Sequence, residues 1–331
     1  MIYSSLISGY LLLVSVYNLN PPEVQILIQT GLDFSYVEEY DSAQIYFDEV
    51  IKLYPENPAG YFFKAALLQL KMMDECQYLE EKEYLSLINQ TIEYAGKFLE
   101  EENLWAEFYL GSSYTYQAVY KGLKSDYFEA FKYGVKGGRI LQGIIKKDST
   151  FYDAYLGAGT FEYFWARAAR YFPVLKLVGG DANEAIRKLH IASEKSLYSG
   201  PTAKNSLVFI YGEEGDFTKA DSIVDSLLSK YPDSRTFLWN KAESEFNKKN
   251  YHVAAGLYNN LFSIYNSQNN KNYANLAQCK LFIGKCFYKL KEEEKAKQAL
   301  KKVISFKKYS DEYPQIKIYC KVAYGLLSRI F

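Results

Sequence analysis

Apolar residues recur at helical spacing along most of the chain, and the pattern is clearest in residues 201–268. The stretch 217–230 carries apolar residues at i, i+4 and i+7, which lie on one face of a helix: Ala220, Val224 and Leu227. Residues 204–211 predict a helix before it, and Gly215-Asp216 between the two predicts a turn in which glycine adopts a positive φ. Pro232 follows the second helix, where proline cannot continue it. The stretch therefore predicts a helix–turn–helix unit.

This unit repeats, because Ala254 stands 34 residues after Ala220. The same spacing of 12 residues separates four pairs of positions at which paired helices are expected to approach closely. The pairs are Gly31 and Ala43, Val208 and Ala220, Ala242 and Ala254, and Gly284 and Ala296. These recurrences resemble the tetratricopeptide repeat (TPR) family. The resemblance implies an all-α, right-handed superhelical solenoid of about six or seven antiparallel helix pairs, with a C-terminal capping helix.

The predicted organisation has four regions. They are a probable signal peptide or N-terminal apolar helix at 1–20, an N-terminal TPR-like array at 21–148, a divergent repeat with an insert at 149–200, and a C-terminal TPR array with its capping helix at 201–331. In the N-terminal array, residues 72–83 predict an acidic insertion that delays the next helix until residues 88–99.

The divergent repeat carries a second resemblance. Its residues are Tyr155-Leu156-Gly157-Ala158-Gly159-Thr160-Phe161, then Pro173, then Leu177-Val178-Gly179-Gly180-Asp181. Residues 151–211 resemble the tetratricopeptide repeat protein 39 / Iml2 family and similar exported bacterial TPR proteins. That resemblance implies an alternative function as a membrane-surface or lipid-associated protein, which liposome flotation would test. The insert 171–180 and the apolar C-terminal helix are the features that motivate this alternative, and both are also candidate interfaces.

The net charge of the chain and its content of cysteine, histidine and glycine argue against several classes of function. The 39 basic residues balance the 39 acidic ones, so no global field draws the chain to nucleic acid or an anionic membrane. The four cysteines form no CxxC pair and are expected to be small core residues, and two histidines leave little for metal or general-base work. The glycines of 134–143 lack the strand and Lys-Ser/Thr of a phosphate loop, and predict close helix packing. We expect no catalytic residue, cofactor or metal.

The TPR resemblance implies that the first helix of each pair lines a concave groove in which a peptide binds. Residues at groove positions are Trp105, Tyr109, Ser112, Tyr116, Tyr155, Asn205, Phe209, Trp239 and Glu243. Trp and Tyr are common binding anchors and equally common packing residues. The Lys and Asn set that clamps a C-terminal carboxylate in some TPR proteins is absent from these positions, so chaperone-tail binding of that type is not expected.

The N-terminal run Leu6–Tyr17 is apolar and too short to span a bilayer comfortably. Its length and position suit the central region of a signal peptide, although no Lys or Arg precedes it and no A-x-A site follows. A first helix packed on the array is the alternative. The resulting hypothesis is a non-catalytic scaffold that binds a protein or peptide partner, exported to the bacterial periplasm or envelope, with a cytoplasmic location as the alternative. Neither the partner nor the oligomeric state follows from the sequence.

Overall fold

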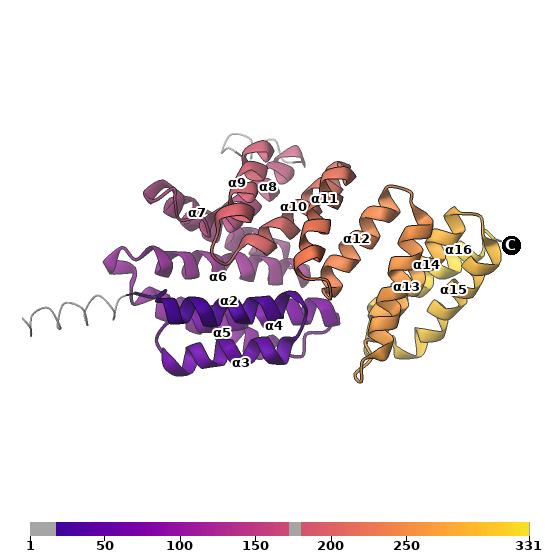
Figure 1. Cartoon of the computed structure of the whole chain (residues 1–331), viewed down its shortest axis with the longest axis horizontal. Helices are drawn as coiled ribbons and strands as arrows, with labels where there is room; N and C mark the ends of the chain where they lie inside the picture. The colour runs from indigo at the N-terminus through magenta and orange to yellow at the C-terminus, as the bar shows by residue number, and fades with distance from the viewer. Residues whose placement is uncertain (1–17, 172–179, 331) are drawn as a thin grey trace, which may run out of the picture. The chain divides into compact units, whose positions relative to one another are not determined.

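The computed structural model describes residues 18–171 and 180–330, and all regular structure in them is helical (Figure 1). The predicted apolar N-terminal helix and most of the insert 171–180 lie outside these residues. The α-helices follow one another as α2 (Pro22–Tyr36), α3 (Tyr40–Leu53), α4 (Pro58–Glu75), α5 (Glu81–Gly96), α6 (Leu104–Leu123), α7 (Tyr127–Lys147), α8 (Ala154–Tyr171), α9 (Ala182–Lys195), α10 (Gly200–Glu214), α11 (Phe217–Lys230), α12 (Arg235–Asn247), α13 (Tyr251–Ser267), α14 (Tyr273–Lys289), α15 (Glu293–Ser305) and α16 (Gln315–Leu327). The predicted all-α repeat architecture is confirmed.

The chain forms two compact units. The first, here called the N-unit, comprises Met1–Leu70 and Glu80–Leu207. The second, the C-unit, comprises Lys71–Leu79 and Val208–Phe331. The short segment Lys71–Leu79, which ends α4 and leads to α5, is therefore part of the C-unit although it lies far from it in sequence.

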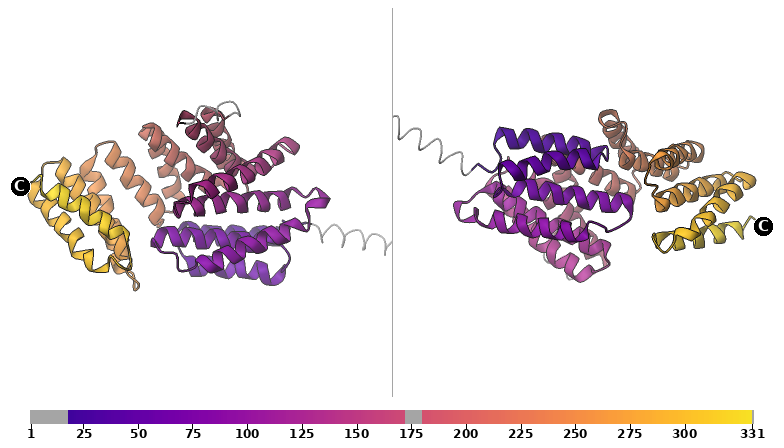
Figure 2. Two further views of the ribbon diagram at one scale, coloured as in Figure 1. Left: turned by 180° about the vertical axis from the view of Figure 1, so that it is seen from behind. Right: turned by 90° about the horizontal axis from the view of Figure 1, so that it is seen from below.

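In the N-unit, α2 packs against α3, and each helix from α5 to α9 packs against the next, most extensively α6 against α7 (Figure 2). Glycine makes this contact close: a Cβ on Gly137 would lie 2.5 Å from the carbonyl oxygen of Gly111, and one on Gly138 would overlap the ring of Phe161. The prediction that the glycines of this helix serve close packing is confirmed at these two positions. Gly143 on the same helix faces open space.

In the C-unit, each helix from α11 to α16 packs against the next, and Figure 1 shows the successive helices of this unit in antiparallel arrangement. The observed α11 has the predicted bounds, and its predicted face is buried. The last helix, α16, packs against both α14 and α15. It buries four side chains there: Ile316, Cys320, Ala323 and Leu327. The predicted capping helix is thus confirmed.

The turns between paired helices share one geometry. Where the structure describes the turn, a residue just after the first helix takes a positive φ: Glu38, Cys76, Ser125, Gly215, Lys249 and Lys291. The next amide then bonds to a carbonyl of the last helical turn, as where Asp216 N–H donates to the carbonyl oxygen of Tyr211 at 2.9 Å. This is the Schellman helix end, which satisfies carbonyls that the helix leaves unpaired. The predicted positive φ of Gly215 is confirmed at +79°.

The predicted acidic insertion at 72–83 is wrong. Its first residues continue α4 to Glu75, and its last residues begin α5 at Glu81 rather than at residue 88. Acidic side chains are favourable in the first turn of a helix, where the dipole is positive, so Glu81 and Glu83 support the earlier start. All four cysteines are free thiols; three are buried as expected, while Cys76 is only half-buried.

Candidate binding surfaces

In the N-unit, the candidate groove residues of α6 pack into an aromatic core. Trp105 makes an edge contact with Phe151 at a centroid distance of 4.7 Å, and contacts Tyr109 and Tyr198 as well. Tyr109 is fully buried, and its burial raises its pKa well above the ordinary value. Tyr116 is half-buried, with a pKa raised by burial to about 12.

Two further N-unit candidates are also buried, namely Ser112 and Tyr155. The hydroxyl of Tyr155 donates to the carbonyl oxygen of Ser149 at 2.9 Å, which fixes the turn before α8. Asn205 is half-buried on α10. The N-unit candidates therefore serve mainly as packing residues in this structure.

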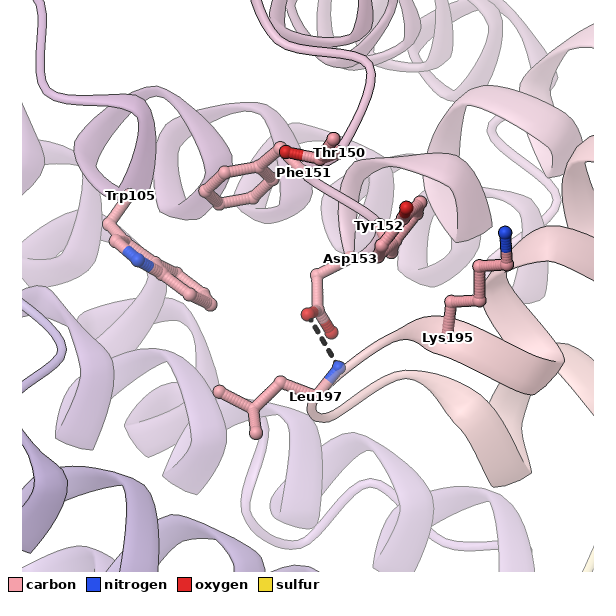
Figure 3. Close-up of a pocket in the computed structure, with 7 residues that line it drawn as sticks. All are labelled: Trp105, Thr150, Phe151, Tyr152, Asp153, Lys195 and Leu197. Atoms are coloured by element: carbon pink, nitrogen blue, oxygen red, sulfur yellow. Dashed lines mark hydrogen bonds between the residues drawn. The ribbon is translucent and has the colours of Figure 1, made fainter.

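Beside Trp105 lies a hollow of about 190 Å³ (Figure 3). Its lining residues are Trp105, Thr150, Phe151, Tyr152, Asp153, Lys195 and Leu197. The buried carboxylate of Asp153 accepts hydrogen bonds from the backbone N–H groups of Leu197, Tyr198 and Ser199 at 2.9 to 3.0 Å, and from the Ser199 hydroxyl. Burial raises the pKa of Asp153 although these hydrogen bonds oppose the rise. This carboxylate holds the turn before α10, and all its described bonds go to that turn.

The C-unit brings aromatic side chains from three helices together. Trp239 of α12 contacts Tyr258 of α13 at a centroid distance of 5.3 Å and Phe282 of α14 at 6.2 Å, while Phe282 stacks on Tyr258 at 4.8 Å. Trp239 Nε1 donates to the hydroxyl of Tyr265 at 3.0 Å, so the indole is held at both ends. Trp239 and Phe282 are half-buried. We call Trp239, Tyr258 and Phe282 the aromatic floor.

Two opposite charges stand next to this floor. Glu243, one turn after Trp239, has a pKa raised by partial removal from water and by the carboxylate of Glu213, against the attraction of Lys285. Lys285, about one turn after Phe282 on α14, places its Nζ 4.3 Å from the Phe282 ring centroid. Its pKa is lowered by desolvation, against the attraction of Cys286 and Glu243. Glu243 is exposed and Lys285 is half-buried, so a bound partner can place an opposite charge against each.

The C-unit holds three of the sequence candidates: Trp239 and Glu243 lie at the floor, and Phe209 is 49% exposed on α10. The sequence reasoning missed Phe282 and Lys285. The signal was present: Lys285 follows Gly284 as Glu243 follows Ala242, once the longer spacing before α14 is taken into account. Aligning on the small residues, rather than on the strict period, would have found it.

The described residues also bear on two other kinds of feature, a metal site and a membrane-spanning helix. Within residues 18–171 and 180–330, no group of three His, Cys, Asp or Glu side chains is arranged to hold a metal ion. Over the same residues, no helix combines the length and apolar character that crossing a bilayer requires.

Comparison with known proteins identifies the repeat. The tetratricopeptide repeat family profile matches residues 283–315, which cover the end of α14, all of α15 and the start of α16. No curated protein sequence matches the chain.

Three solved structures are similar in fold. The APC/C hetero-tetramer Cut9–Hcn1 matches with a TM-score of 0.53 and 15% identity, over 89% of this chain and 53% of that chain. This chain therefore spans about half of that protein. The C-terminal part of a TPR protein from Cytophaga hutchinsonii matches at a TM-score of 0.45 and 15% identity, over 86% and 96% of the two chains. A thermophilic TPR protein of Thermus thermophilus gives 0.42 and 16%, over 67% and 99%. At these identities the likeness concerns the fold alone.

Proposed function

Because this chain is built of tetratricopeptide repeats, we propose that it is a non-catalytic scaffold that binds a protein or peptide partner on the C-unit. One observation carries the proposal: the half-buried rings of Trp239 on α12 and Phe282 on α14 lie beside two opposite charges, Glu243 and Lys285. Tryptophan is among the residues enriched in interaction hot spots. The similar fold of Cut9, solved as a hetero-tetramer with Hcn1, supports a role in protein assembly.

The partner's chemistry follows from these groups. An apolar or aromatic side chain of the partner would cover the rings of Trp239 and Phe282. A basic group would meet Glu243, and an acidic group would meet Lys285, so that the charges of the two partners are complementary. A peptide with one apolar anchor flanked by opposite charges is therefore the expected ligand.

Selection from a random peptide library against the whole chain tests this function. Selected peptides should bind the Lys285→Glu variant at least tenfold more weakly, because the reversed charge repels their acidic group. The matched control is Lys301→Glu on the exposed surface of α15, which should leave affinity unchanged. Equal loss in both variants, or no peptide that senses Lys285, would contradict the proposal.

For location, the proposal is export to the bacterial envelope, supported by the apolar run Leu6–Tyr17. The N-terminal residue and cell fraction of the native protein test it. A start between Asn18 and Glu23 in an envelope fraction is the expected result, and an intact Met1 in the cytosol would overturn it. The lipid-associated alternative is motivated by the insert 171–180, most of which lies outside the described residues, by the apolar C-terminal helix, and by the resemblance of residues 151–211.

A further inference from the structure

The C-unit holds a segment of its own chain by a set of specific polar contacts. The segment is the end of α4, and its central residue is Asp74. The Asp74 carboxylate accepts a hydrogen bond from Nη2 of Arg235 at 2.6 Å and another from the Tyr265 hydroxyl at 3.1 Å. The ion pair is shielded from water, since the side chains of Asp74 and Arg235 are 10% and 12% exposed.

Three consecutive backbone carbonyls of the segment are also bound. Asn275 Nδ2 donates to the carbonyl oxygen of Asp74 at 2.7 Å, and Asn272 Nδ2 donates to that of Glu75 at 2.5 Å. Gln315 Nε2, at the start of α16, donates to that of Cys76 at 3.0 Å. The last carbonyls of any helix lack partners within the helix. Three side-chain amides of the C-unit supply those partners to α4.

The binding groups are held in place by contacts that do not involve the segment. Asn272 caps α14, because its Oδ1 accepts the backbone N–H of Asn275 at 3.0 Å. Arg235 is the first residue of α12, and its guanidinium lies 5.7 Å from the Tyr265 ring centroid. Trp239 of the aromatic floor donates to the same Tyr265 hydroxyl that donates to Asp74. The carboxylate site and the aromatic floor are therefore joined through one tyrosine.

From this geometry we infer that Arg235, Tyr265, Asn272, Asn275 and Gln315 form a recognition site for an acidic helix C-terminus, which residues 74–76 fill in this structure and which an acidic helix end of a partner protein would fill in their place. Arg235 and Tyr265 bind the aspartate carboxylate, and the three amides bind the carbonyl oxygens at the helix end. The inference rests on the proposed function, because it specifies the partner of the same C-unit surface.

The chain's own segment is tethered, so it competes at the high effective concentration of an intramolecular ligand. A free peptide should therefore bind the natural chain weakly and bind a variant with a weakened tethered segment tightly. Asp74→Asn is that variant, because it removes the charge that pairs with Arg235 and leaves the binding groups unchanged.

The experiment measures fluorescence anisotropy of a labelled peptide of residues 69–78, with serine at position 76, against the full chain. The Asp74→Asn chain should bind it at least tenfold more tightly than the natural chain. Adding Arg235→Gln to that variant should abolish the gain, and a peptide with asparagine at position 74 should not bind. No gain in Asp74→Asn, or a gain that survives Arg235→Gln, would overturn the inference.

A second readout uses the natural chain and depends on no variant's folding. Burial and the nearby Asp74 carboxylate raise the pKa of the Cys76 thiol to about 11, so this thiol reacts slowly at pH 8. Excess peptide should displace the segment and speed the labelling of Cys76 at least tenfold, with the buried Cys279, Cys286 and Cys320 unchanged as internal controls. Failure of the peptide to speed this labelling would overturn the inference.

The two proposals fail separately. Peptides selected from a library that sense Lys285 but not Arg235 would support the scaffold function and contradict the acidic-helix site. If no selected peptide senses Lys285 but the 69–78 peptide binds in a way that depends on Arg235, the acidic-helix site would be supported and the scaffold function on the aromatic floor contradicted.

Discussion

At single positions, the burial of a side chain decides whether it only packs in the core or can also contact a partner. Tyr109 and Trp239 were both placed at groove positions by the repeat register, yet Tyr109 is fully buried and Trp239 is half-buried. The register fixes only which face of a helix a residue occupies. How deeply that face is covered depends on the rings of neighbouring helices, such as Phe151 and Tyr198 against Trp105, and these contacts cannot be predicted from one repeat alone.

The conformation of the turn residues also could not be predicted fully from the sequence. Only Gly215 was predicted to have a positive φ, because glycine alone signals one. Lys249 and Lys291 adopt the same conformation without that signal, at φ values of 67° and 60°. The hydrogen bonds of the helix end, which form only in the folded pair, hold these residues there.

A matched pair of turn variants follows. Lys291→Gly should stabilise the chain by about 1 kcal/mol, because a residue with a Cβ is strained in the left-handed region. Gly215→Ala should destabilise it by a similar amount, about 1 kcal/mol, for the same reason. Urea unfolding measures both; stabilisation by Gly215→Ala would show that the turn is not held in this conformation.

A second pair of variants lies on α7. Gly137→Ala should destabilise the chain by about 1–3 kcal/mol, because the added Cβ meets the backbone of Gly111 and Thr115, which cannot rotate away. Gly143→Ala on the same helix meets nothing and should stabilise by about 1 kcal/mol through helix propensity. Thermal unfolding monitored by circular dichroism compares them, and equal effects would contradict the close α6–α7 packing.

Whole helices were easier to predict than the joints between them. The bounds of α11 agree with the sequence prediction, because a clear apolar face ends at a turn signal on both sides. The start of α5 was placed too late, because its first turn is acidic and carries no apolar signal. The site formed by the end of α4 could not be predicted, since residues 71–79 and 235–315 come together only through tertiary structure.

A cluster of charges joins α11 to α12. Asp221 pairs with Lys241 at 2.7 Å and with Lys248 at 2.8 Å, and Lys248 also pairs with Glu245 at 2.7 Å. Burial acts to raise the pKa of Asp221, but hydrogen bonds from the two lysines outweigh burial and the net shift is downward. The pKa of Lys241 is raised, because its carboxylate partners outweigh the opposing effect of burial.

Asp221→Asn should therefore lower the free energy of unfolding by about 1–3 kcal/mol at neutral pH. Since the folded pKa of Asp221 lies below its unfolded value of about 3.9, its contribution is complete above that pH and is lost as pH falls through the folded pKa. The difference between the two proteins should thus shrink below about pH 4. Asp225→Asn is the control, because that carboxylate is 58% exposed and should change stability by less than about 1 kcal/mol. A difference that persists at pH 2 would contradict the electrostatic explanation.

Taken as a whole, the chain combines two units with different characters. The N-unit candidates are mostly packed, and its hollow beside Trp105 is lined by a carboxylate that holds a turn. The C-unit carries the aromatic floor, the opposite charges of Glu243 and Lys285, and a carboxylate site filled by the chain itself. Binding is therefore assigned to the C-unit, where α12 and α14 carry the half-buried rings and the charges.

Hydrogen–deuterium exchange of the whole chain, with and without a library-selected peptide, tests this assignment most directly. We expect added protection in α12 and α14, with α15 unchanged, because the partner covers the rings and charges that α12 and α14 carry. Protection confined to α15, or to helices of the N-unit, would contradict this assignment.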